Sequence, residues 1–292
     1  MPKVSVILPV YNEEKWVSSA INSILNQTLA DFEFLIINDG SQDNTEEVVR
    51  SFSDSRIKLI NNEKNLGLAQ ALNKGLFMAL SSYIARIDAD DLALPTRLEK
   101  QVKFLEENPE VAVLGTAAYH NDEIRKEKFI RIPPTDDHEI KSEMVKYVPL
   151  EHSSIMARTS VLKEMGGYDD HYDDIEDLEL WIRIGRENKL ANLSEPLIIR
   201  NLRPDSFWFS NYSAVARQLK FSRVAKKAIS AFNLPKWYYF YTLTKVFYGI
   251  VPNSFKRLAR KIASKSIETP VRELPRLGQC RRVRPPVRQN IG

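Results

Sequence analysis

Short apolar runs rich in β-branched residues alternate with amphipathic patterns over the first 118 residues, and this alternation restricts the fold more than any other feature of the chain. Each run is short enough to be a strand, and each pattern that follows has apolar residues at helical spacing. Strands separated by single helices need crossover connections, which place them in a mainly parallel sheet. We therefore expect an α/β fold with helices flanking the sheet. The predicted strands are residues 4–8, 34–37, 57–60, 83–87 and 111–118, and the predicted helices are residues 13–28, 45–52, 68–80 and 95–107.

The second half of the chain is less regular. Beyond Asn211 the pattern is helical and then basic. From Glu268 onward, prolines and arginines replace most apolar residues, which predicts disorder. Between these halves the sequence predicts a strand at 153–156, a helix at 160–164, a helix that follows the acidic run 169–177 and ends at Arg186, and a strand at 196–200.

Composition excludes several classes of protein. The chain has 292 residues, 43% of them apolar and 27% charged, as in ordinary globular proteins. Its single cysteine, Cys280, excludes a disulfide framework and a zinc site built from thiolates. The four histidines show no spacing typical of metal ligands. The Met-Pro-Lys-Val start carries no apolar signal segment, so we expect a cytoplasmic protein.

Basic residues are concentrated toward the C-terminus. Residues 253–292 contain 11 Lys and Arg against 2 Asp and Glu, whereas the rest of the chain contains 31 against 36. The mildly acidic body argues against binding to nucleic acid. The basic segment, which follows the aromatic residues 237–241, fits peripheral contact with an anionic membrane surface. The alternative is a helix that packs on its own domain and is followed by solvated charge.

Polar clusters follow three of the predicted strands, at residues 11–13, 38–39 and 88–91. Ligands of a parallel α/β sheet bind beyond the carboxyl ends of its strands, so we expect one binding site at this edge. The sequence lacks G-x-G-x-x-G, G-x-x-x-x-G-K-[ST], H-E-x-x-H and G-x-S-x-G motifs. Acid and base chemistry is therefore expected to come from carboxylates.

Three of those carboxylates are Asp88, Asp90 and Asp91, directly after a buried strand. Asp88 and Asp90 can share one face if the extended backbone continues. Clustered carboxylates repel one another unless a cation compensates, and their hard oxygens suit Mg²⁺ or Mn²⁺. The alternative is a solvated acidic turn before the helix that starts at Pro95.

Five segments together resemble the family 2 glycosyltransferases, over about residues 4–200. They are Val-Ser-Val-Ile-Leu-Pro-Val-Tyr-Asn-Glu-Glu at 4–14, Ile-Ile-Asn-Asp-Gly-Ser-Gln-Asp at 36–43, Ala-Arg-Ile-Asp-Ala-Asp-Asp at 85–91, Gly-Gly-Tyr at 166–168 and Glu-Asp-Leu-Glu-Leu-Trp at 176–181. The resemblance implies a GT-A fold, with a Rossmann-like sheet, and a helical C-terminal extension. It also implies a nucleotide-diphosphate sugar donor, a divalent metal and inversion at the anomeric carbon.

The resemblance assigns a first group of residues to the nucleotide. Pro9, Tyr11 and Glu13 would line the nucleotide pocket. Asp39 would accept a hydrogen bond from the base, such as a uracil N–H, which favours a UDP-sugar. Asn65 would add a further contact on the nucleotide side.

A second group would hold the metal and perform the transfer. Asp90 would be the main metal ligand, with Asp88 directed toward the ribose and Asp91 supporting either one. Asp177 matches the catalytic base of the family's Glu-Asp motif, and helical spacing places it on one face with Leu180 and Trp181. A departure from the family pattern lies beside the base, where Leu178-Glu179 replaces the usual aromatic residue and Asp.

The implied organisation has three parts. Residues 1–205 would form the transferase domain, with a nucleotide-binding half at about 1–118 and an acceptor half at about 119–205. Residues 206–267 would form a helical extension in contact with a membrane, and residues 268–292 a disordered basic tail. The processive Q-x-x-R-W motif is absent, so we expect single transfers to a glycan or lipid-linked acceptor in cell-surface polysaccharide synthesis. A sugar nucleotidyltransferase and a non-catalytic nucleotide-sugar-binding protein are the alternatives.

Other residues keep two interpretations each. Arg86 either neutralises a phosphate or pairs with a neighbouring acid, and Gly166-Gly167 either approaches the donor sugar or ends a helix. His152 and the serines after it either contact the sugar or make ordinary loop hydrogen bonds. Trp16 and Trp181 are expected in the core.

Overall fold

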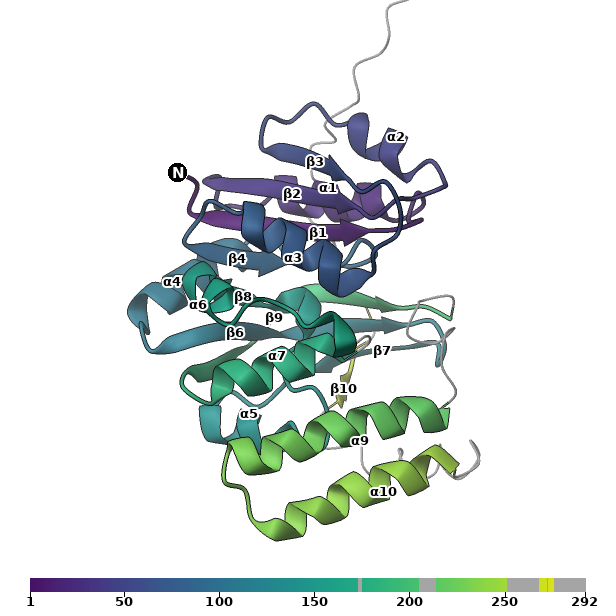
Figure 1. The fold of residues 1–292 in the computed structure, drawn as a ribbon. Coiled ribbons are helices and arrows are strands. Elements are labelled where there is room, and N and C mark those ends of the chain that lie inside the picture. Colours follow the sequence, from purple (N-terminus) through teal and green to yellow (C-terminus); the bar gives the residue numbers. More distant parts are fainter. Residues whose placement is uncertain (173–174, 205–213, 251–267, 272, 276–292) are drawn as a thin grey trace, which may run out of the picture.

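The computed structural model describes residues 1–172, 175–204, 214–250, 268–271 and 273–275 (Figure 1). Its first half alternates strands and helices in the predicted order. The elements are β1 (Val4–Val10), α1 (Val17–Leu25), β2 (Phe32–Asn38), α2 (Thr45–Arg50), β3 (Ile57–Asn61), α3 (Leu68–Met78), β4 (Tyr83–Arg86), β5 (Leu92–Ala93) and α4 (Arg97–Glu107).

The second half begins with a long strand and ends in helices. Its elements are β6 (Val111–Asp122), β7 (Glu127–Arg131), α5 (Asp137–Glu143), η1 (His152–Ser154), β8 (Met156–Arg158), α6 (Thr159–Glu164), η2 (Asp170–Tyr172), α7 (Glu176–Gly185), β9 (Lys189–Leu202), α9 (Ala214–Ala231), η3 (Lys236–Tyr238), α10 (Tyr239–Ile250) and β10 (Glu268–Pro270).

The strands form one sheet in the order β10-β7-β6-β8-β4-β1-β2-β3, and β9 pairs with β5 and β6. The neighbours β4, β1, β2 and β3 are parallel, as the crossover pattern predicts. In the second half β8 is antiparallel to β4 and β6, and β7 is antiparallel to β6. The α/β class with flanking helices is therefore confirmed, and the complete sheet is mixed.

Both faces of the central strands are buried. All seven residues of β1 lie in the interior, with Val6 and Leu8 in one core and Ile7 in the other. This alternation follows from the two-residue period of a strand and explains why β1 reads as an uninterrupted apolar run. The helices α1 and α4 cover the first face, and α3, α6 and α7 cover the second.

Three sequence expectations need correction. The strand predicted at 153–156 begins only at Met156, the first residue of β8, because the N–H of Ser154 bonds to the carbonyl of Glu151 and closes a short helical turn before it. The strand predicted at 196–200 is longer in the structure, where β9 covers Lys189–Leu202. It runs parallel to β6, with register shifts in the middle of the pairing. Disorder from Glu268 onward is wrong for Glu268–Pro270, which pairs antiparallel with β7. The predicted tail beyond residue 275 lies outside the described residues.

The expected helical extension is present in residues 214–250, where α9 and α10 pack together as the outermost layer of the molecule (Figure 1). The other parts of 206–267 lie outside the described residues. Among the helices that are described, none has the length and apolar character needed to cross a bilayer.

Candidate functional site

The loops after β1 and β2 are tied to each other at the predicted edge of the sheet. Asn12 has a φ of 55°, and its N–H donates to Ser41 Oγ at 3.0 Å. Its Oδ1 accepts the N–H of Gln42 at 2.8 Å. Pro9 is buried within β1, whereas Tyr11 is 41% exposed. The two loops therefore hold Tyr11 in a fixed place where a ligand can reach its ring.

Asp39 organises the loop that precedes α3. Its Oδ1 accepts from Asn62 Nδ2 at 2.7 Å and from the N–H of Leu66 at 3.0 Å, and its Oδ2 accepts from the N–H of Gly67 at 2.9 Å. Asn65, from the same loop, is exposed and accepts a second bond from Gly67. The structure thus places Asp39 beside Asn65, and the buried carboxylate holds the loop before α3 by accepting its backbone N–H groups. Recognition of a nucleotide base by either residue stays a prediction.

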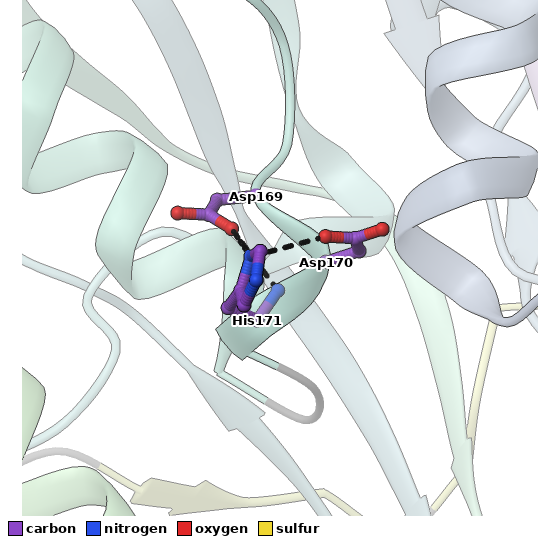
Figure 2. Close-up of side chains that lie close together, drawn as sticks. All are labelled: Asp169, Asp170 and His171. Atoms are coloured by element: carbon purple, nitrogen blue, oxygen red, sulfur yellow. Dashed lines mark hydrogen bonds and ion pairs between the residues drawn. The ribbon is translucent and has the colours of Figure 1, made fainter.

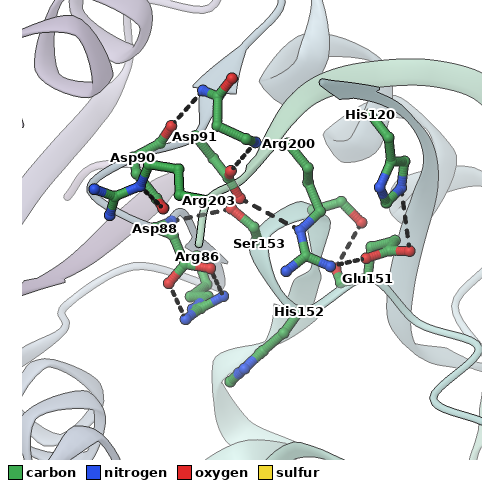
Figure 3. A network of polar contacts seen from close by, with 12 residues as sticks. Arg86, Asp88, Asp90, Asp91, His120, Glu151, His152, Ser153, Arg200 and Arg203 are labelled. Carbon is green, nitrogen blue, oxygen red and sulfur yellow. Dashed lines mark hydrogen bonds and ion pairs between the residues drawn. The ribbon is translucent and has the colours of Figure 1, made fainter. Parts of the chain in front are cut away.

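Asp88, Asp90 and Asp91, hereafter the acidic triad, follow β4, and their ligand atoms lie within 4.8 Å of one another (Figure 3). Arg97, fully buried in α4, donates to the carbonyl of Arg86 at 2.7 Å. This bond fixes the end of β4 immediately before the triad. Asp88 and Asp90 converge as expected, but through a turn in which the Asp91 N–H donates to the Asp88 carbonyl at 3.2 Å, and not through continued extended backbone.

Each carboxylate of the triad lies beside a different arginine (Figure 3). One arginine is in β4 and the other two come from the end of β9, more than 100 residues away in sequence. The pairs are Arg86 Nη1 with Asp88 Oδ2 at 2.7 Å, Arg203 Nε with Asp90 Oδ2 at 3.0 Å, and Arg200 Nε with Asp91 Oδ2 at 3.7 Å.

The electrostatics of the triad suit a divalent cation. Burial and the nearby Asp90 charge raise the pKa of Asp91 to about 8, and burial with the Asp88 charge raises the pKa of Asp90. Like charges that strain one another in this way are stabilised by a cation, and carboxylate oxygens are the ligands that Mg²⁺ and Mn²⁺ prefer. The donor set therefore fits the expected metal. Asp91 is the most buried member, and its Oδ1 accepts the N–H of Asn201 at 3.0 Å.

Asp177 is the second residue of α7, on the face whose next members, Leu180 and Trp181, are fully buried as expected. The side chain of Asp177 is only 15% exposed, and this burial raises its pKa to about 6. Its Oδ2 lies 3.9 Å from Nδ1 of His152, and its neighbour Glu176 is buried at 4.0 Å from the same nitrogen. Asp177 is therefore a carboxylate that can hold or release a proton near neutral pH.

The turn η1 connects Asp177 to the acidic triad. His152 faces Asp177, and the next residue, Ser153, accepts the N–H of Asp88 at 3.0 Å (Figure 3). Arg86 also acts on both parts, since its charge opposes the rise in the Asp177 pKa while it pairs with Asp88. The predicted metal ligands and the predicted base are thus parts of one site.

A buried ionic cluster beside the triad was not predicted. Glu151 accepts from Arg200 Nη1 at 2.5 Å and from Arg131 Nη1 at 2.8 Å, and His120 Nε2 lies 3.6 Å from it (Figure 3). Burial opposes ionisation of Glu151, but the two arginines hold its pKa well below the usual range. No local motif marks this cluster, because its members come from β6, β7, β9 and the segment before η1.

Asp169, Asp170 and His171 form a second group whose side chains converge, although histidine spacing did not suggest it (Figure 2). His171 Nδ1 lies 2.9 Å from Asp169 Oδ1 and 3.3 Å from Asp170 Oδ1. His171 is highly exposed, and its pKa is raised by the hydrogen bond to Asp169. An exposed ion pair accounts for this geometry.

The structure also decides several open interpretations. Arg86 pairs with the neighbouring Asp88. Gly166 and Gly167 both have positive φ, and their N–H groups bond back to α6, so they end that helix. Trp181 is in the core as expected. Trp16 is not, because its ring lies 4.8 Å beneath the Arg203 guanidinium at the surface of the site.

The chain was compared with known proteins. A family model described as "Glycosyl transferase family 2" matches residues 5–166. EpsE of Bacillus subtilis, which is named a glycosyltransferase, is 38% identical over 73% of this chain and 77% of its own length. "UDP-Glc:alpha-D-GlcNAc-diphosphoundecaprenol beta-1,3-glucosyltransferase WfgD" of Escherichia coli is 32% identical over 65% of this chain and 73% of its own length.

Solved structures share the fold at low sequence identity. S. aureus TarS 1–349 in complex with UDP-GlcNAc has a TM-score of 0.67 and 21% identity, over 90% of this chain and 76% of that one. The Pyrobaculum calidifontis mannosyltransferase PcManGT, in complex with GDP-Man and Mn²⁺, has a TM-score of 0.60 and 18% identity, over 90% and 80%. These similarities confirm the expected GT-A fold class.

Proposed function

This chain belongs to glycosyl transferase family 2, and from that premise we propose that it transfers a sugar from a nucleotide-diphosphate sugar to an acceptor hydroxyl, with inversion at the anomeric carbon. The observation that carries the proposal is the joining of two carboxylate sites by one short turn. The acidic triad lies on one side of η1, and Asp177 lies on the other.

Asp177 is the proposed general base. An acceptor hydroxyl must lose its proton as it attacks, and a positioned carboxylate contributes about 10²–10⁴-fold to such a step. A pKa of about 6 leaves Asp177 mostly ionised at neutral pH, yet makes it a stronger base than an ordinary aspartate. His152 lies beside the carboxylate and packs edge-on against Trp181, and the Asp177 side chain is only 15% exposed to water.

Asp90 and Asp88 are the proposed ligands of Mn²⁺ or Mg²⁺, with Asp91 in support. A bound divalent ion would supply charge that stabilises the diphosphate as it leaves. The task of the protein residues is to keep the carboxylates together, and Arg97 and Ser153 contribute by fixing the backbone that leads into Asp88. Pro9, Tyr11, Glu13, Asp39 and Asn65 are the proposed nucleotide contacts.

A UDP-sugar is the proposed donor, and a glycan or lipid-linked acceptor in cell-surface polysaccharide synthesis is the proposed second substrate. The name of WfgD includes UDP-Glc and a diphosphoundecaprenol acceptor, and the TarS structure contains UDP-GlcNAc. The amylovoran biosynthesis glycosyltransferase AmsE of Erwinia amylovora, 33% identical, supports the same kind of product.

Calorimetric titration of UDP, with and without Mn²⁺, tests the proposal on the full chain. Binding that depends on the metal and is lost in Asp90→Ala supports it. Asp177→Asn should keep UDP binding and lose transfer, because it removes the base without touching the nucleotide. Binding of GDP alone would change the donor, and a nucleotidyltransferase would instead consume UTP and a sugar phosphate. Binding without any transfer would favour a non-catalytic protein.

Peripheral contact with the cytoplasmic face of a membrane is part of the same proposal. The outward face of α10 and the turn before it expose Trp237, Phe240 and Leu243, with Lys236 beside them. Aromatic and apolar side chains next to a cation suit the headgroup region of an anionic bilayer. Co-sedimentation with vesicles containing phosphatidylglycerol, and its loss in Trp237→Ser/Phe240→Ser, tests this contact. Equal sedimentation of the variant would contradict it.

A further inference from the structure

Arg203 connects two parts of the site that no motif relates. It directly follows β9, and its Nε donates to Asp90 Oδ2 at 3.0 Å. Its Nη2 donates to both oxygens of Glu13, at 2.8 Å and 3.0 Å, in the loop after β1. The guanidinium also stacks over Trp16. One cation therefore bridges the main predicted metal ligand and a predicted nucleotide contact.

The bridge is largely shielded from solvent. Arg203 is 5% exposed, and the side chains of Asp90 and Glu13 are both mostly covered. Ion pairs in such positions are screened weakly and have well-defined geometry, unlike pairs on an open surface. A second cation that approaches Asp90 must therefore compete with a guanidinium already in place.

The three arginines beside the acidic triad differ in which of their hydrogen bonds and ion pairs a bound metal would disturb. Arg86 lies two residues from Asp88, on the same segment. Arg200 pairs mainly with Glu151, so a metal bound at the triad would leave this main ion pair of Arg200 in place. Arg203 donates to both Asp90 and Glu13, the residues at which metal and nucleotide are expected.

We propose that Arg203 holds Asp90 in the empty enzyme and is released to the donor diphosphate, so that metal binding depends on the nucleotide. The inference rests on the proposed function. A guanidinium and a divalent cation compete for the same carboxylate oxygen, whereas a diphosphate offers the guanidinium new bidentate acceptors. The nucleotide draws Arg203 away from Asp90 and so exposes the carboxylate to the metal, and a metal at Asp90 frees Arg203 for the diphosphate. Metal and nucleotide therefore bind with positive coupling.

The test measures Mn²⁺ binding, not activity. Loss of the electron paramagnetic resonance signal of free Mn²⁺ is followed as protein is added, with and without saturating UDP. The variants are Arg203→Gln, which removes the positive charge of the side chain, and Arg203→Lys, which keeps that charge but loses the guanidinium N–H groups that reach Asp90 and Glu13 together. Arg56→Gln is the matched control, since Arg56 also pairs with a carboxylate, Asp54, and stacks on an aromatic ring, Phe32, far from the triad in sequence and contacts.

In the wild type and in Arg56→Gln, UDP should tighten Mn²⁺ binding strongly. Arg203→Gln should bind Mn²⁺ about tenfold or more tightly without UDP, because close charge pairs of this kind couple by at least that factor. It should also lose most of the tightening caused by UDP, and Arg203→Lys should fall between. Thermal unfolding of each variant checks that it is folded.

Two results separate the inference from the function on which it rests. If the wild type binds Mn²⁺ with UDP and Arg203→Gln shows the same or weaker binding without it, the inference is overturned and the transferase proposal stands. If neither protein binds Mn²⁺ with UDP or GDP, both are overturned. Tighter Mn²⁺ binding by folded Arg203→Gln in the absence of nucleotide, together with a loss of most of the tightening caused by UDP, supports the inference.

Discussion

The imidazole of His152 lies between the hydroxyl of Tyr168, 2.9 Å from Nε2, and the carboxylate of Asp177, 3.9 Å from Nδ1. Burial lowers the pKa of His152 well below its usual range, so the ring is neutral when Asp177 ionises. The proposed base therefore has a neutral imidazole beside it, while the charges of Arg86 and Arg200 oppose the rise in its pKa that burial causes.

Replacing His152 should affect the base and spare the nucleotide. In His152→Ala, water can reach Asp177, and its pKa should move down toward that of an exposed aspartate. We expect kcat to fall about tenfold or more from lost positioning, with UDP affinity unchanged. The pH profile of kcat and a calorimetric titration measure the two effects. Tyr168→Phe, which removes only the hydroxyl, is the milder control. An unshifted profile would assign His152 to packing alone.

The activity of the wild type should increase with pH along an acid limb centred at about 6, because the base form is the ionised Asp177 carboxylate. His152 does not account for such a limb, since burial lowers its pKa well below the usual range. Initial rates between pH 5 and 8, at saturating donor and fixed ionic strength, give the midpoint of kcat. A limb near pH 4 would indicate an unshifted carboxylate and contradict the assignment.

The same burial should make the ionised form of Asp177 lower the free energy of unfolding. Its pKa is higher in the folded than in the unfolded chain, so the folded state binds the proton more tightly, and stability is lost as pH rises from about 4 to about 6. Above that range Asp177→Asn should stabilise the protein by about 3 kcal/mol. Urea unfolding at pH 5 and pH 8 checks this, and a gain that does not grow with pH would refute it.

Asp39→Asn should destabilise the protein, because an amide NH₂ would then face backbone N–H groups that the carboxylate now satisfies. Leaving such donors unpaired costs about 1–3 kcal/mol. The free energy of unfolding in urea measures the loss. Asp136→Asn is the control, since Asp136 caps α5 and asparagine caps equally well. Unchanged stability in Asp39→Asn would remove the structural task assigned to this carboxylate.

Gly40 and Gly166 form a matched pair of glycines with φ of 74° and 75°. A Cβ on Gly40 would lie 2.6 Å from the backbone carbon of Lys64, whereas one on Gly166 would meet nothing within 4 Å. Both alanine variants carry the strain of the left-handed backbone, of order 1 kcal/mol. Gly40→Ala should lose clearly more stability than Gly166→Ala and should weaken UDP binding. Equal losses by thermal unfolding would show that the loop before α3 can shift.

Local sequence was sufficient for the parts of the site that lie beside a strand end or a helix start. The positions of Asp88 and Asp90 could be predicted because they follow a buried strand, and that of Asp177 because it starts the buried, periodic face of α7. Arg200 and Arg203 could not, since their partners are set by the pairing of β9 with β5 and β6, and no local period encodes it.

Two errors have the same origin. Trp16 belongs to an apolar stripe, but its ring contacts Arg203, which comes from the far end of the chain. Glu268–Pro270 has little strand propensity of its own and is ordered by the free edge of β7, where a proline is tolerated.

Pairing each carboxylate of the triad with an arginine has a consequence for how quickly a donor arrives. A nucleotide-diphosphate sugar is an anion, and three bare aspartates would repel it during diffusion. With one guanidinium beside each carboxylate, the triad does not present three uncompensated negative charges. The association rate of the donor should therefore change little with ionic strength.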